Sequence, residues 1–91
     1  MTHLLCRNNV SDFAKWKKVF DSHAHAHREA GLKLRHVWRG TENPNNVFFM
    51  FEVVDLNKAL AFIQTPAAAE AGKASGVIDG EYHFLEDTAG Y

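Results

Sequence analysis

Three histidines stand at alternate positions of one segment, His23, His25 and His27. On a helix, His23 and His27 share a face and can approach one cation, whereas His25 points to the opposite side. Imidazole is a common zinc ligand, but a catalytic zinc needs three protein ligands. The candidates for the third ligand lie in the expected strands: His3, His36 and His83. The helical His-Glu-x-x-His pattern is absent and no carboxylate stands beside the pair, so we expect no resident metal and only weak, adventitious binding at His23 and His27.

His27 is also the candidate general base. Its ordinary pKa lies near neutral pH, and burial on the apolar face of a helix keeps such a ring neutral. An oxygenase or cyclase without a bound cofactor needs a pocket that excludes water and a group that moves a proton. We expect five further residues to line this pocket: Trp16, Phe20, His23, His36 and Trp38. The alternatives are a partly buried His27 satisfied by a backbone carbonyl, and aromatic residues that only pack the core.

Other chemistries find little support in the sequence. The single cysteine, Cys6, excludes an internal disulfide and a multi-cysteine zinc site, and it fits a reducing compartment as a buried structural residue. No glycine-rich phosphate loop, nucleophile elbow or dinucleotide fingerprint is present. The Phe48–Phe51 run lacks the glycine and the basic flank of an RNA-contacting strand. The formal net charge of −1 gives no drive toward nucleic acid or an anionic membrane.

Length and composition are typical of one small globular domain, residues 1–91. Apolar residues make up 46% of the 91 residues and charged residues 23%. No apolar run approaches the roughly 20 residues of a membrane span, and the N-terminal residues lack a secretory apolar region, so we expect a cytoplasmic protein. A domain of this size has a thin core, so a partner subunit would help to stabilise it.

The elements that position these residues follow from periodicity and caps. Residues 3–8 form a short apolar run typical of a first strand. Ser11 is the expected N-cap of one long helix that ends near residue 30, with Gly31 as the residue after its C-terminus. At helical spacing, one face of this helix carries the apolar residues and the candidate base: Phe13, Trp16, Phe20, Ala24 and His27.

The segment 32–40 alternates as a strand does. Leu34, His36 and Trp38 lie on one side of it. The other side carries Lys33, Arg35, Val37 and Arg39. Which side faces the helices stays open at this stage. If the parity is reversed, Arg35, Val37 and Arg39 face the pocket and make an anion-binding site.

The rest of the chain completes a β-α-β-β-α-β order. Turn-forming residues 41–46 join the second strand to a third at 47–54. Asp55 is the expected N-cap of a helix over 56–64, and Pro66 begins an alanine-rich helical continuation to about residue 74. A last strand covers 81–86. The fold class is therefore α+β, with a ferredoxin-like, four-stranded antiparallel sheet and both helical regions on one face.

The third strand indicates what covers the second face of the sheet. Val47, Phe49 and Phe51 point one way, and Phe48 and Met50 point the other, so both faces are apolar. An antiparallel strand with one solvent-exposed face should alternate apolar with polar residues. We therefore expect a homodimer packed sheet to sheet through Phe48 and Met50. The alternative is that these two side chains are simply exposed.

A set of caps, turns and core positions covers nearly the whole chain. They are Val10-x-Asp12-Phe13-x-x-Trp16-Lys17-x-Val19-Phe20-Asp21, Arg28-x-x-Gly31, Asn43-Pro44-Asn45-x-Val47, Phe62-Ile63-Gln64-Thr65-Pro66 and Ala71-Gly72-x-x-x-Gly76-Val77. This set resembles small proteins of the dimeric α+β barrel superfamily. That superfamily also holds antibiotic biosynthesis monooxygenases, stress-responsive barrel proteins, some polyketide cyclases and haem-degrading enzymes. The resemblance implies a barrel formed across a dimer, with a ligand pocket between sheet and helices.

Two functions follow as hypotheses. The first is a homodimer with a small apolar pocket, acting as a cofactor-independent monooxygenase or cyclase on a small aromatic or polyketide-like molecule. The second is a non-catalytic ligand-binding or stress-related module. The substrate cannot be read from the residues, because fold does not fix function.

Overall fold

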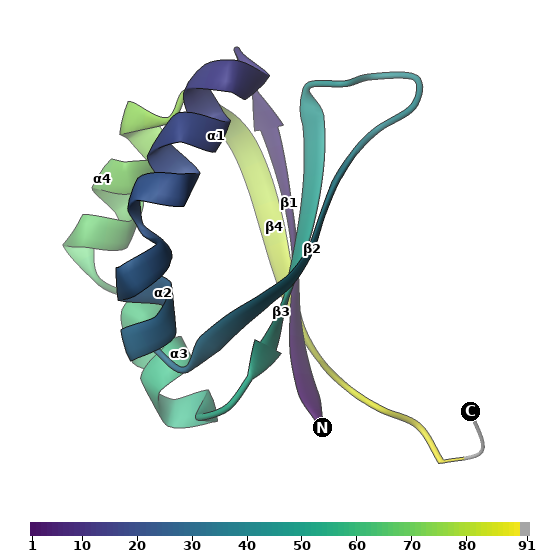
Figure 1. Cartoon of the computed structure of the whole chain (residues 1–91), viewed down its shortest axis with the longest axis vertical. Coiled ribbons are helices and arrows are strands. Elements are labelled where there is room, and N and C mark those ends of the chain that lie inside the picture. Colours follow the sequence, from purple (N-terminus) through teal and green to yellow (C-terminus); the bar gives the residue numbers. More distant parts are fainter. Residues whose placement is uncertain (90–91) are drawn as a thin grey trace.

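The computed structural model describes residues 1–89, and these form one antiparallel sheet with helices on one face (Figure 1). The elements in chain order are β1 (Thr2–Val10), α1 (Phe13–Ser22), α2 (Ala24–Glu29), β2 (Leu32–Arg39), β3 (Asn46–Val53), α3 (Leu56–Ile63), α4 (Pro66–Ala74) and β4 (Val77–Glu86). The strand order is β2-β3-β1-β4, with every neighbouring pair antiparallel. The predicted α+β, ferredoxin-like fold is confirmed.

The first helical region is broken at His23, and the prediction of one long helix is wrong. In a continuous helix the His23 backbone N–H would donate to the Val19 carbonyl. Here that carbonyl instead accepts the Ser22 hydroxyl at 2.6 Å and His23 Nδ1 at 2.8 Å. The His23 N–H turns to the Phe20 carbonyl at 3.1 Å. Local side-chain bonds of this kind compete with the helical ladder, so α1 ends at Ser22 and α2 begins at Ala24.

Acidic or hydroxyl side chains cap the starts of α1, α3 and α4, whereas His23 precedes α2 without a side-chain cap. Asp12, not the expected Ser11, caps α1, and its carboxylate accepts the Lys15 N–H at 3.3 Å. Asp55 caps α3 as predicted, accepting the Lys58 N–H at 3.1 Å. Thr65 caps α4, with Pro66 as its first residue. Each cap satisfies a backbone donor that has no partner within the helix.

The core lies between the helices and the sheet. Leu4 and Cys6 of β1 and the odd-numbered residues of β3 point into it, and Trp16 of α1 is only 1% exposed. The β1–β3 register pairs Leu4 with Phe51 and Cys6 with Phe49, so neighbouring strands supply one apolar layer. The prediction that Val47, Phe49 and Phe51 share one side of the strand is confirmed: all three are buried in the core, as is Val53.

A β-bulge in β2 changes the parity of that strand. Leu34 pairs with Phe51, but the next pair is His36 with Met50, so Arg35 is the extra residue. After the bulge, Val37 pairs with the inward-pointing Phe49. Because an inserted residue shifts all later side chains to the other face, strict alternation along 32–40 does not hold.

The second face of the sheet is left open by the elements described (Figure 1). The register brings Leu5 of β1, Phe48 and Met50 of β3 and Trp38 of β2 to this face. Trp38 is 46% exposed there. No helix among residues 1–89 is long and apolar enough to cross a membrane. The apolar residues predicted for the open face are therefore present, and the register also places His3, Arg7, Glu52 and His83 on it.

Candidate functional site

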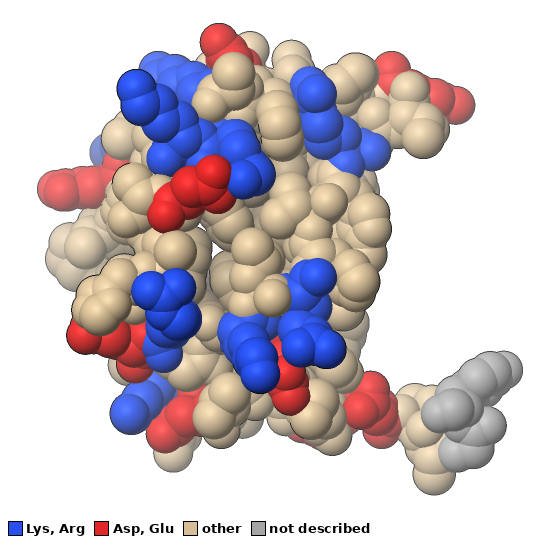
Figure 2. Space-filling model, in the orientation of Figure 1, with Lys and Arg blue, Asp and Glu red and all other residues tan. Residues whose placement is uncertain are grey.

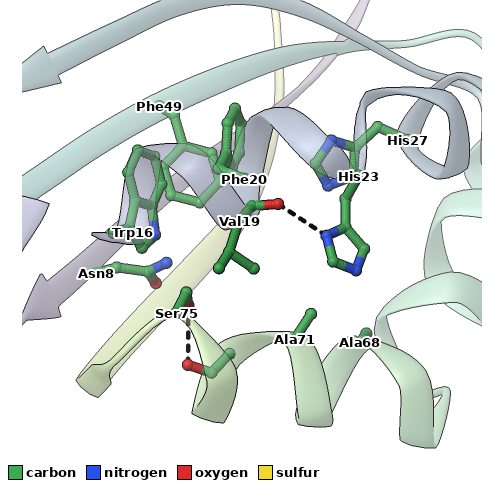
Figure 3. Close-up of a pocket in the computed structure, with 11 residues that line it drawn as sticks. Asn8, Trp16, Val19, Phe20, His23, His27, Phe49, Ala68, Ala71 and Ser75 are labelled. Atoms are coloured by element: carbon green, nitrogen blue, oxygen red, sulfur yellow. Dashed lines mark hydrogen bonds between the residues drawn. The ribbon is translucent and has the colours of Figure 1, made fainter. Parts of the chain in front are cut away.

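A cavity of about 160 Å³ lies between the first helical region, α4 and the sheet (Figure 3). Trp16 and Phe20 of α1 and Phe49 of β3 form its aromatic wall. The opposite side comes from α4, where Ala71 and Gly72 are too small to fill the space. A Cβ added at Gly72 would meet no heavy atom within 4 Å. The cavity exists because large aromatic residues on α1 face small residues on α4.

The three rings of the aromatic wall contact one another. The rings of Trp16 and Phe20 stack with centroids 4.6 Å apart, and Trp16 lies 5.4 Å from Phe49. Phe20 meets Phe49 edge-on at 5.1 Å. At the inner end, with the Asn8 amide turned so that its oxygen faces the indole, that oxygen accepts the Trp16 indole N–H at 3.2 Å and the amide nitrogen donates to the Arg7 carbonyl at 3.0 Å. These contacts bury Trp16 almost completely and leave the half-buried Phe20 as the ring of this wall that a ligand can contact.

His27 lies at the outer end of this wall in apolar surroundings. Its ring centroid is 5.1 Å from both Phe20 and Phe51 and 5.8 Å from Phe62. Burial, and then the charge of His23, lowers the pKa of His27 from 6.5 to about 4. The imidazole is therefore neutral at neutral pH, as burial on this face predicts.

The nitrogens of His27 are free to act on a ligand. Within residues 1–89 the ring forms no hydrogen bond, so the backbone carbonyl considered from the sequence does not satisfy it. Neither nitrogen is sealed from solvent, in contrast to His3 Nδ1, which is buried without a partner. A neutral imidazole has one acceptor and one donor nitrogen. His27 thus offers both an acceptor and a donor inside an apolar site.

His23 presents a second acceptor at the same end. Its Nδ1 donates to the Val19 carbonyl, which leaves Nε2 without a proton when the ring is neutral (Figure 3). The ring centroids of His23 and His27 are 6.5 Å apart. The bond that breaks the helix therefore also fixes the tautomer of His23.

The sheet histidines do not join this pair. His3, His36 and His83 pair with Glu52, Met50 and Leu5, so all three point to the open face. The helices lie on the other face (Figure 1). Among the described residues no group of three or more His, Cys, Asp or Glu is placed to hold a metal. The third ligand considered from the sequence is therefore on the wrong side of the sheet.

His36 and Trp38 do not line the cavity, which corrects the sequence prediction for both. The bulge at Arg35 turns them to the open face, where their rings stack at 4.7 Å. The alternative prediction, in which Arg35, Val37 and Arg39 face the pocket, is also only partly right. Val37 and Arg39 face the helices, and the Arg39 guanidinium lies 4.0 Å above the Phe13 ring, whereas Arg35 pairs with Glu52 at 3.8 Å.

Sequence reasoning missed the α4 side of the cavity. Ala68, Ala71, Gly72 and the buried Ser75 line it, and Ser75 Oγ donates to the Gly72 carbonyl at 2.9 Å. Small residues carry no chemical signature of their own. The available signal was their spacing, since positions 68, 71, 72 and 75 share one helical face.

A second hollow, of about 290 Å³, lies on the other side of His27 between α2 and β2. Phe20 and His27 line both hollows, so their rings, 5.1 Å apart and tilted by 45°, form a shared wall. Leu32 and Leu34 of β2 form its apolar side. Figure 2 shows this hollow between the helix layer and the sheet, with basic side chains on both. A ligand can therefore reach His27, the candidate general base, from the molecular surface.

The structure is similar to several solved proteins. A candidate antibiotic biosynthesis monooxygenase from Deinococcus radiodurans matches with a TM-score of 0.73 at 18% identity, over 100% of this chain and 96% of the other. A NIPSNAP domain protein from Burkholderia xenovorans matches with 0.71 at 15%, over 100% and 98%. A candidate antibiotic biosynthesis monooxygenase from Caulobacter crescentus matches with 0.74 at 15%, over 96% and 89%.

These identities show a shared fold, and the resemblance drawn from the sequence is confirmed for the fold. No protein-family model matches the chain. No curated protein matches it either. The chemistry of the site therefore has to be argued from its own residues.

Proposed function

We propose that the chain binds a small aromatic molecule with a ring hydroxyl, and that His27 takes the proton of that hydroxyl. Proton removal is the first step of a monooxygenation or cyclisation that uses no bound cofactor. The observation that carries the proposal is a neutral His27 with no hydrogen bond to the described protein, at the end of an apolar cavity.

The size of the cavity selects a ligand with one ring. An apolar protein cavity of about 150 Å³ accommodates a benzene molecule. The cavity beside His27 measures about 160 Å³, below the roughly 300 Å³ at which pockets for drug-sized ligands begin. A single ring placed against Phe20 would fill it. Larger polyketide-like molecules would need the second hollow as well.

The environment of His27 suits a proton transfer coupled to binding. In the empty protein its pKa of about 4 makes it a weak base. A hydroxyarene that gives up its proton leaves an anion beside the imidazolium, and an opposite charge at short range raises the pKa of the imidazole. The proton then lies between two groups in an apolar site where their attraction is strong. The electron-rich anion is the species that reacts with O₂ or closes a ring.

The open face of the sheet supports a homodimer. Phe48, Met50, Leu5 and Trp38 form an apolar surface on a chain whose own described elements do not cover it. Exposed apolar surfaces of this kind mark interfaces, and a two-fold pair of identical faces is the commonest assembly. We place the dimer in the cytoplasm, in keeping with the free, buried Cys6.

Calorimetric binding of 4-hydroxybenzamide tests the pocket. For a ligand of this size we expect a Kd on the order of 1 mM. His27→Phe keeps an aromatic ring and removes both nitrogens, so binding should weaken about tenfold. His25→Phe, at a side chain that is 75% exposed, is the matched control and should bind like the wild type. Equal binding by all three proteins would refute the assignment of His27.

A non-catalytic binding protein is the second candidate. It is favoured by the lining of the 160 Å³ cavity, which within residues 1–89 includes no carboxylic acid that could return a proton from His27. Oxygen consumption with hydroxyarenes that autoxidise slowly separates the two functions. A rate that depends on His27 supports the enzyme, and binding without any protein-dependent rate supports the binding module.

A further inference from the structure

Two histidines stand at one end of the 160 Å³ cavity, and each has a nitrogen to offer a ligand. Within residues 1–89 the His27 ring forms no hydrogen bond, and His23 bonds through Nδ1, which lies 2.8 Å from the Val19 carbonyl oxygen. A carbonyl cannot donate, so Nδ1 carries the proton of the neutral ring and Nε2 can only accept. Figure 3 shows both imidazoles at this end, with the free nitrogen of His23 on the side of α4.

The other polar side chains of the cavity wall are already engaged. With its amide turned toward the indole, Asn8 bonds to Trp16 and to the Arg7 carbonyl. Ser75 is buried, and its hydroxyl donates to the Gly72 carbonyl at 2.9 Å. The described part of the lining therefore concentrates its unused acceptor nitrogens at the histidine end.

The number of protons at this end sets what a ligand must bring. A ring hydroxyl has one proton, and the proposed function gives that proton to His27. The same hydroxyl cannot also donate to His23 Nε2. A ring that fills the cavity displaces the water that would otherwise satisfy this nitrogen, and an acceptor left without a partner weakens binding. His23 therefore favours a ligand with a second hydroxyl beside the first.

The spacing of the two imidazoles suits adjacent hydroxyls. Their ring centroids are 6.5 Å apart, and their planes are inclined by 36°. Hydrogen bonds of about 2.8 Å from neighbouring oxygens of one ring can span this separation. A second hydroxyl on the opposite atom of the ligand ring would point away from both histidines.

We propose that the ligand of this site is a vicinal dihydroxyarene, with one hydroxyl meeting His27 and the adjacent hydroxyl donating to His23 Nε2. The inference rests on the proposed function, because it assumes the contact with His27. It adds a substrate class and makes His23 a specificity-determining residue. The proton of the second hydroxyl stays on its oxygen, so His23 binds and orients the ring while His27 takes the proton of the first.

Calorimetric titrations with three benzamides, under argon to prevent oxidation, test the proposal. The reference is 4-hydroxybenzamide. The second probe, 3,4-dihydroxybenzamide, adds a hydroxyl beside the first, and the third, 4-hydroxy-3-methylbenzamide, adds a group of similar size that cannot donate. We expect the wild type to bind the dihydroxy probe about fivefold more tightly than the reference, which is the net gain of one hydrogen bond. The methyl probe should bind no more tightly than the reference.

Variants and a second readout assign the preference to His23. In His23→Phe the ratio of the dihydroxy to the reference affinity should fall to about one, because a ring remains and Nε2 is lost. His25→Phe, at a side chain that is 75% exposed, is the matched control and should keep the fivefold ratio. In the nuclear magnetic resonance spectrum of the wild type, the Nε2 signal of His23 should shift more with the dihydroxy probe than with the methyl probe.

The outcomes separate the inference from the proposed function. A dihydroxy probe that binds no better than the reference, while the reference still binds through His27, would overturn the inference and leave the proposed function standing. A fivefold preference that survives in His23→Phe, or that the methyl probe shares, would also overturn it, since the gain would then come from contacts other than His23. Failure of all three probes to bind would overturn the inference together with the proposed function.

Discussion

Replacing His27 should remove a large part of the acid sensitivity of folding between pH 6.5 and pH 4. The folded protein holds this imidazole among Phe20, Phe51 and Phe62, where the charged form is disfavoured and the pKa falls to about 4. In the unfolded chain the ring is hydrated and titrates near 6.5. Between these two values the unfolded state binds a proton that the folded state does not.

The sign and size follow from linkage. Because the unfolded state binds more protons in this pH range, the free energy of unfolding rises with pH. The folded protein therefore loses stability as the pH falls from 6.5 to 4. A pKa difference of about 2.5 units at about 1.4 kcal/mol per unit corresponds to about 3 kcal/mol at pH 4, and to about 2 kcal/mol at pH 5. Water that reaches the ring makes these values upper estimates. Above pH 6.5 the residue has no effect on the pH dependence.

Urea denaturation at fixed protein concentration, from pH 7 down to pH 4, measures this effect. The comparison is between slopes, so that acid losses shared by all variants cancel. His27→Phe keeps the aromatic packing, and His27→Gln keeps a polar side chain. In both variants the free energy of unfolding should fall by about 2 to 3 kcal/mol less than in the wild type over this pH range. His25→Gln, at an exposed position, should follow the wild type. Parallel curves for the wild type and both His27 variants would refute the assigned environment of His27.

Three further predictions concern the sheet, the cavity and the thiol. Met50→Asp should convert the dimer to a monomer in light scattering, whereas Val54→Asp, at a side chain 74% exposed outside the strands, should not; a Met50→Asp dimer would mean that the interface is elsewhere. Gly72→Ala should raise the free energy of unfolding by about 0.5–1 kcal/mol in urea melts, because alanine has a higher helix propensity and its Cβ would meet no atom within 4 Å. The added methyl group should also narrow the cavity and weaken 4-hydroxybenzamide binding. A loss of stability would contradict the open space beside Gly72. Burial raises the pKa of Cys6 to about 12, so the thiol should be inert to a disulfide reagent at neutral pH in the native protein and react once denatured; rapid reaction in the native protein would contradict its burial.

The fold was largely predictable because helix caps, turns and hydrophobic periodicity depend on residues that are close in sequence. The N-cap Asp55, the helix start at Pro66, the turn at 41–46 and the shared face of Val47, Phe49 and Phe51 were readable from residue types, although the first cap is Asp12 and not Ser11. The break at His23 was not, because it depends on two side chains that compete for one carbonyl, and neither is a strong helix breaker. Propensity describes each residue alone and misses such a pair.

Only the part of the site that the first helical region contributes could be predicted from the sequence. Trp16, Phe20, His23 and His27 come together as helical spacing predicts, although the helix is interrupted among them. His36 and Trp38 were misplaced because a bulge shifts parity by one residue. The apolar positions Leu32, Leu34 and Val37, spaced by two and then by three, record that shift. The small residues of α4 could be recognised as a cavity wall only once their partner across the space was known.

The most direct test is the nuclear magnetic resonance spectrum of the imidazole nitrogens while 4-hydroxybenzamide is added at neutral pH. The account predicts that the two nitrogens of His27 start as a neutral ring and shift as the hydroxyl of the probe engages one of them, while those of His25 do not move. Shifts confined to the open-face histidines, or none at His27 at a probe concentration well above about 1 mM, would contradict it.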